Sequence, residues 1–112
     1  MDLTKKKCIP CEKGTPPLNE RQENTLVKAV DNWDLVRTGV HRLKKTFRFT
    51  GFSSAIGFVV QTALLAESEG HHPDIHIYYA KVEIELSTHA IGGLSENDFI
   101  LAAKIDDLKK TE

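Results

Sequence analysis

The sequence predicts an α+β fold in the order αββαββα, a four-stranded antiparallel sheet with helices packed on one face. Three stretches repeat apolar residues at the spacing of a helix, and four shorter stretches are extended, two of them with clear apolar and polar alternation. The extended stretches come in pairs joined by short turns, which favours antiparallel pairing. At 112 residues the chain has the size of one domain, so we expect a single domain over residues 1–112.

The first 17 residues are expected to be an irregular lead-in, because prolines and a glycine, including Pro16-Pro17, interrupt any helix there. Asn19 and Gln22 then have the spacing of a capping box. Apolar residues recur on one face after them, which predicts a helix from about residue 20 to residue 30.

The first pair of strands is expected over Trp33–Val36 and Val40–Thr50. In the longer strand, one face carries Leu43, Lys45, Phe47 and Phe49, and the other carries Arg42, Lys44, Thr46 and Arg48. This alternation is typical of a strand with one buried and one exposed face.

A second helix is expected around Ala55–Ala66, capped by Ser53 or Ser54 and ended by Gly70. This helix is apolar nearly all round, and one sheet can cover only one side of it. We therefore expect a second subunit to cover the other side, which predicts a homo-oligomer.

The second pair of strands is expected within Ile75–Thr88, where apolar residues alternate with lysine and glutamate. A last helix follows, with its start at Ser95 and with Asp98 in its third position. Its apolar stripe consists of Leu101, Ala102, Ile105 and Leu108.

Charges are distributed unevenly along the chain. Residues 1–50 hold 11 Lys and Arg against 6 Asp and Glu, whereas residues 51–112 hold 4 against 10. A basic half can mark a nucleic-acid surface, but the net charge of -1 makes nucleic acid an unexpected partner. No apolar segment reaches the ~20 residues of a membrane span and no secretory signal is visible, so we expect a cytoplasmic location, with the nucleus as a further possibility.

Histidines are the most informative chemical group in the sequence. His71-His72 follows the predicted end of the second helix, and His89 follows the last strand. Because the two open ends of a hairpin are neighbours, we expect these three side chains to converge. Imidazole can act as acid or base near neutral pH, which favours an elimination or isomerisation over hydrolysis. The alternative is a histidine cluster without chemistry.

A metal site is another interpretation of the histidines. Adjacent His71 and His72 point apart on an extended chain, although His72 and His76 can share a strand face. Cys8 and Cys11 form a single two-cysteine motif without the second pair that a zinc site needs. We therefore expect no metal and no other cofactor, and two ordinary buried thiols.

Several of these residues together resemble the motif of the pterin-4a-carbinolamine dehydratases, the family that includes the dimerisation cofactor of a homeodomain transcription factor. The motif residues are Glu67, His71, His72, Pro73, Tyr79, His89 and Asp98. The likeness extends to Cys8-x-x-Cys11, Pro16-Pro17-Leu18, Trp33, Phe47-Arg48-Phe49 and the segment 52–66, and covers about residues 8–108. The resemblance implies an αββαββα subunit that forms dimers or tetramers and dehydrates 4a-hydroxytetrahydropterin without metal or cofactor.

The resemblance also suggests roles for individual residues. His71 and His89 are expected to exchange protons with the substrate, and His72 is expected to hold the pterin edge, so all three are catalytic candidates. Glu67 and Asp98, together with His72, are candidates for substrate binding. Alternatively, Glu67 is a solvated helix residue and Asp98 caps the last helix.

A different class of function is also open. The protein can be an interaction module without enzymatic activity that stabilises a partner protein's oligomer through the exposed part of the apolar helix.

Overall fold

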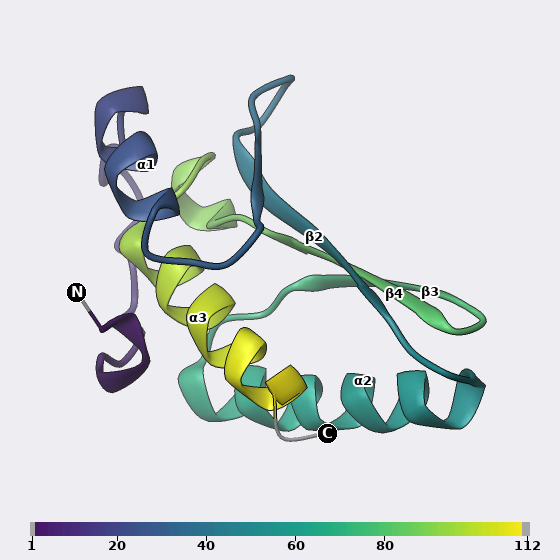
Figure 1. Cartoon of the computed structure of the whole chain (residues 1–112). Coiled ribbons are helices and arrows are strands. Elements are labelled where there is room, and N and C mark those ends of the chain that lie inside the picture. Colours follow the sequence, from purple (N-terminus) through teal and green to yellow (C-terminus); the bar gives the residue numbers. More distant parts are fainter. Residues whose placement is uncertain (1, 111–112) are drawn as a thin grey trace.

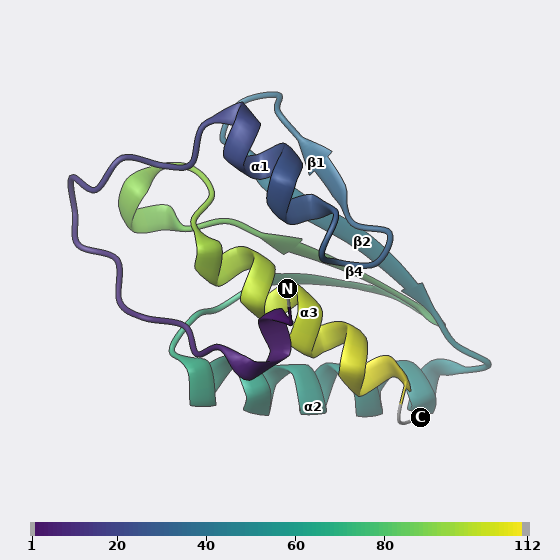
Figure 2. The same cartoon turned by 60° about the vertical axis from the view of Figure 1, so that its left-hand side comes forward.

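The computed structural model describes residues 2–110 and contains one antiparallel sheet in the spatial order β1-β2-β4-β3. The elements in chain order are η1 Leu3–Lys5, α1 Glu20–Val27, β1 Asp34–Val36, β2 Arg42–Arg48, α2 Phe52–Glu69, β3 Asp74–Tyr78, β4 Lys81–Leu86, η2 His89–Ile91 and α3 Glu96–Lys110. In Figures 1 and 2 the helices lie on one face of the sheet, with α2 and α3 packed against each other and α1 beside α3. The α+β prediction is confirmed.

The core lies between the sheet and these helices. Leu43 and Phe47 of β2 are buried there, as are the alternate residues Val82, Ile84 and Leu86 of β4. Each such side chain stabilises the fold by about 1.5–3 kcal/mol relative to an exposed position. The intervening residues Arg42, Lys44, Glu83 and Glu85 fall on the opposite face, because successive side chains of a strand alternate between its faces.

Helix α2 is buried along one side only. Ala55, Phe58, Thr62 and Ala66 are buried, at the three- and four-residue spacing of one helix face. On the other side Val60 is 53% exposed and Leu64 is 68% exposed. Within residues 2–110, no helix has the length and apolar character needed to span a membrane.

Two predicted details of the helices are wrong. Helix α1 ends at Val27 and not at residue 30, because the chain closes the next turns with hydrogen bonds between residues three apart. Neither Ser53 nor Ser54 caps α2. Its N-cap is Gly51, whose carbonyl accepts the first helical bond from the amide of Ala55, since the chain already turns away from the sheet after β2.

The lead-in over residues 1–17 is also not wholly irregular. It begins with the short 3-10 helix η1, which Asp2 caps by accepting a hydrogen bond from the amide of Thr4 at 3.1 Å. Leu3 is 1% exposed and joins the core. The prolines and glycine that predicted an irregular segment lie further along the chain and do not restrict these residues.

Gly70 ends α2 as predicted, and its geometry places His71. Gly70 adopts a left-handed conformation, with φ +65°. Its amide donates to the carbonyl of Glu67, and the amide of His71 donates to the carbonyl of Ala66, which together form a Schellman motif. The chain therefore reverses direction at this point, and His71 is the first side chain beyond the helix.

Ion pairs within the molecule explain the uneven charge along the sequence. Cations of the first half meet anions of the second half in the pairs Lys6–Glu96, Arg42–Glu85, Lys44–Glu83 and Lys45–Asp106. The Lys45–Asp106 pair is the most buried of these, with side chains 15% and 7% exposed. The lysine and arginine side chains of the first half of the chain thus pair with acidic side chains of the second half.

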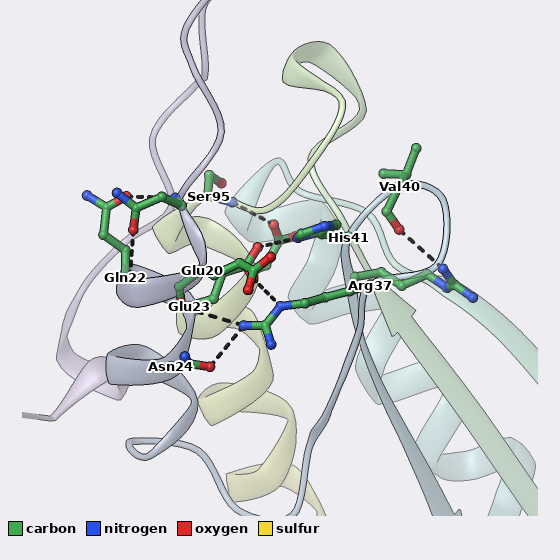
Figure 3. Close-up of polar contacts among 11 residues, drawn as sticks. Glu20, Gln22, Glu23, Asn24, Arg37, Val40, His41 and Ser95 are labelled. Carbon is green, nitrogen blue, oxygen red and sulfur yellow. Dashed lines mark hydrogen bonds and ion pairs between the residues drawn. The ribbon is translucent and has the colours of Figure 1, made fainter.

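Glu23 of α1 is a fully buried carboxylate that ties this helix to the segment between β1 and β2. Its two oxygens contact Arg37 Nε and His41 Nδ1, each at 2.9 Å. In Figure 3 the Arg37 guanidinium also reaches Asn24, to whose side-chain oxygen it donates at 2.9 Å. Both partners of Glu23 reach solvent, because the side chains of Arg37 and His41 are each 32% exposed.

We predict that Glu23→Ala lowers the free energy of unfolding by about 2–3 kcal/mol, measured by urea denaturation. Removing one partner of a fully buried pair costs about 3–5 kcal/mol, and partial exposure of the two cationic partners reduces that cost. The control is Glu20→Ala, an exposed residue of the same helix, which is expected to change stability by less than about 0.5 kcal/mol. Equal effects of the two variants would contradict this assignment.

Candidate functional site

A surface cavity of about 310 Å³ brings together the three histidines of the predicted site. This volume is at the lower end of the range for small-molecule sites, about 300–1,000 Å³. The lining residues come from the N-terminal segment, the turn after α2, the segment after β4 and the start of α3. They are Ile9, Pro10, Cys11, Gly70, His71, His72, Ser87, Thr88, His89, Ala90 and Asn97.

His71 is held by a buried carboxylate. Its Nε2 lies 2.6 Å from Asp98 Oδ1, and the two side chains are 11% and 0% exposed. An ionised carboxylate only accepts hydrogen bonds, so the ring carries its proton on Nε2. Nδ1 is then the acceptor of the neutral ring, and no protein hydrogen bond to Nδ1 occurs within residues 2–110. An imidazole with one nitrogen fixed by a carboxylate and the other free is able to act as a general base.

Asp98 also has a structural role. Its Oδ2 accepts hydrogen bonds from Thr88 Oγ1 at 2.8 Å and from the Ser95 amide at 3.0 Å. The second bond is the helix-start contact that the sequence predicts, and the first fixes the segment that carries His89. One carboxylate therefore caps α3 with one oxygen and orients His71 with the other.

His72 lies at the outer rim of the cavity. Its Nε2 is 2.5 Å from Glu67 Oε1, and the two side chains are 63% and 75% exposed. Glu67 itself does not line the cavity and contacts it through His72. Because both groups are solvated, this pair is worth no more than about 1 kcal/mol of stability.

His89 follows β4 and begins the 3-10 helix η2. A hydrogen bond from the Thr88 amide to the carbonyl of Gly93, at 2.8 Å, joins the two ends of the segment that contains η2. Gly93 tolerates no side chain, because a Cβ there would lie 2.7 Å from Pro17 Cβ. The close approach keeps the His89 segment against the lead-in. His89 is exposed and lines the same cavity as His71.

Two further residues that the sequence analysis names lie away from the cavity. Tyr79 lies at the β3–β4 turn, 74% exposed and at the opposite end of the hairpin from His71. His76 lies outside the cavity, and its Nε2 is 3.2 Å from Glu85 Oε2.

The side chains of His76, Glu83 and Glu85 are close enough to share a metal ion. Arg42 already pairs with Glu85 at 2.7 Å, and Lys44 with Glu83 at 3.7 Å. A cation there would compete with both, so this group is better described as a set of ion pairs.

The sequence analysis missed Asn97 and the N-terminal residues of the cavity. Asn97 is 5% exposed and forms two hydrogen bonds with the backbone of Ile9. A sequence separation of 88 residues hides this contact from any local pattern. The two cysteines are free, and both are half-buried, whereas the sequence predicts buried thiols.

The model of the family described as Pterin 4 alpha carbinolamine dehydratase matches residues 16–108. The chain belongs to this family. A Methylococcus capsulatus protein provisionally named pterin-4-alpha-carbinolamine dehydratase is 46% identical over 106 residues, which is 95% of this chain and 92% of that protein. The Arabidopsis thaliana protein named pterin-4-alpha-carbinolamine dehydratase 2, mitochondrial, is 45% identical over 96% of this chain and 59% of its own length.

Two solved structures related to the pterin dehydratases have similar folds. A Brucella melitensis transcriptional coactivator/pterin dehydratase is similar with a TM-score of 0.77 and 35% identity, over 82% of this chain and 97% of that one. A pterin dehydratase-like protein described as a RuBisCO assembly factor of the alpha-carboxysome gives a TM-score of 0.60 and 26% identity, over 70% and 89%. The family fold therefore occurs in proteins described by different activities.

We predict that Cys8 reacts with iodoacetamide at pH 8 about a hundredfold or more slowly than an ordinary thiol. Burial, and next the nearby Glu69 carboxylate, raise the pKa of the Cys8 thiol from 9.0 to about 12. Only the thiolate is nucleophilic, so the reaction accelerates with rising pH until the thiol ionises near that value. Mass spectrometry of the digested protein measures the rate, and an ordinary rate at pH 8 would refute the raised pKa and the half-buried position beside Glu69.

Proposed function

We propose that this protein dehydrates 4a-hydroxytetrahydropterin, the pterin-4a-carbinolamine, to quinonoid dihydropterin and water, as in tetrahydrobiopterin recycling. The observation that carries the proposal is the His71–Asp98 pair at 2.6 Å, in a cavity that His72 and His89 also line. Membership of the pterin carbinolamine dehydratase family supports the same substrate class.

The proposed reaction needs one acid and one base. The C4a–O bond breaks, and its electron pair leaves with the hydroxyl group, which takes up a proton to become water. The N5–H proton is lost, and its electron pair forms the N5=C4a double bond. Atoms and electrons balance without an oxidant or a reductant. Positioned imidazoles supply such proton transfers at neutral pH.

His71 and His89 are the proposed proton-transfer residues, in either order. Asp98 acts on His71 as a positioning residue, because it fixes the Nε2–H form and stabilises the imidazolium that forms when Nδ1 accepts a proton. His72, oriented by Glu67, is proposed to hold the polar edge of the pterin. Neither a metal nor a cofactor enters this scheme.

The direct test is a stopped-flow assay with chemically generated 4a-hydroxytetrahydropterin. We expect the protein to accelerate formation of the quinonoid product well above the spontaneous rate, in proportion to protein concentration. A rate equal to the spontaneous one would refute the proposal.

A second candidate function is protein binding through α2. Val60 and Leu64 project from the side of this helix that no element within residues 2–110 covers. The structural neighbour described as a RuBisCO assembly factor supports a role of this kind. The candidates differ in the residues they need: dehydration needs the histidines, whereas partner binding needs the exposed side of α2.

We predict that His71→Ala and His89→Ala each lower kcat/KM for dehydration by about 10²- to 10⁴-fold, the usual contribution of a positioned acid or base. His76→Ala is the control, because this histidine lies outside the cavity, and it should keep nearly full activity. Circular dichroism checks that each variant folds. Rates within threefold of the parent for either cavity histidine would exclude that residue from proton transfer.

We also predict that the protein is a homodimer or homotetramer that buries the exposed side of α2. Leu64→Glu should then yield smaller particles by multi-angle light scattering with an unchanged circular dichroism spectrum, because a buried charge opposes the contact. Thr25→Glu, an exposed change of the same kind on α1, is the control. A parent protein that is monomeric at micromolar concentration would contradict this prediction.

A further inference from the structure

The segment Cys8–Cys11, here named the N-terminal strap, forms a wall of the histidine cavity. Ile9, Pro10 and Cys11 line this cavity together with His71, His72 and His89. The strap lies before residue 16, where the match to the family model begins. The matched region therefore supplies the histidines, and the preceding segment supplies a further wall.

The strap is fixed by specific contacts. The Ile9 amide donates to Asn97 Oδ1 at 3.0 Å, and Asn97 Nδ2 donates to the Ile9 carbonyl at 2.5 Å. The Cys8 amide donates to Glu69 Oε1 at 2.9 Å, and Lys104 pairs with the other oxygen of Glu69 at 2.7 Å. A side chain that bonds both backbone groups of one residue holds that residue in a single orientation, which a binding wall requires.

The strap presents an apolar surface to the cavity, whereas the histidines present polar groups. Ile9 is apolar and 70% exposed, so folding of the chain does not bury it. Pro10 has no backbone N–H, and the backbone groups of Ile9 are already bonded to Asn97. Ile9 and Pro10 thus offer apolar contact without a free backbone N–H, whereas the three imidazoles offer donors and acceptors.

We propose that the strap is the specificity-determining wall of the site and contacts the apolar substituent of a 6-substituted pterin. This inference rests on the proposed dehydratase function. A pterin carries its amide and amino groups on one ring and its substituent on the other. The imidazoles bind the polar atoms and the reacting centre, and Ile9 lies against the carbon substituent.

The test compares the carbinolamines of tetrahydropterin and 6-methyltetrahydropterin in the parent, Ile9→Ala and Lys13→Ala. One methyl contact in a hydrophobic pocket changes kcat/KM by about 10- to 200-fold, and an open wall gives the low end of that range. We expect Ile9→Ala to lower the preference for the methylated substrate about tenfold. Lys13→Ala, an exposed change outside the cavity, should leave the preference unchanged.

A readout independent of turnover completes the test. Cys11 lies in the cavity wall, so saturating 6-methyl-7,8-dihydropterin should slow its alkylation in the parent protein. Turnover with the same preference in the parent and Ile9→Ala, or an unprotected Cys11, would overturn the role of the strap and leave the dehydratase proposal standing. Absence of turnover by the parent would overturn both.

Discussion

The site depends on the buried carboxylate of Asp98. Three segments meet at its two oxygens: the turn after α2 through His71, the segment after β4 through Thr88, and the start of α3 through the Ser95 amide. A carboxylate with 0% exposure is tolerated only when such partners satisfy it. The same bonds that make its burial possible therefore place two of the cavity histidines, one directly and the other through the Thr88 segment.

Buried carboxylates serve the rest of the fold in a similar way. Glu23 joins α1 to Arg37 and His41, and Asp106 of α3 accepts hydrogen bonds from Lys45 and from the Trp33 indole. Every buried side-chain nitrogen and oxygen in residues 2–110 has a partner. These contacts hold the helices on one side of the sheet, where the site can form at the open end of the β3–β4 hairpin. The exposed side of α2 remains open to a second subunit or a partner.

Local patterns in the sequence predict the elements well because each pattern has a local physical cause. Alternation in β2 and β4 and the capping box of Asn19 and Gln22 act over a few residues, and the structure contains all three. The contact between Asn97 and Ile9 joins positions 88 residues apart, and no local pattern signals it. For Asp98, the sequence predicts either helix capping or a contact with the site, whereas the carboxylate has two oxygens and makes both contacts.

The most direct test of this account is the protonation of His71 in the neutral state of its ring, measured by nitrogen NMR on protein with labelled histidine. The account predicts a proton on Nε2, which faces Asp98, and a free Nδ1. His41 is an internal comparison, because it faces Glu23 through Nδ1 and should carry its proton there. A neutral His71 with its proton on Nδ1 would contradict the account, since the ring could then neither donate to Asp98 nor accept a substrate proton at Nδ1.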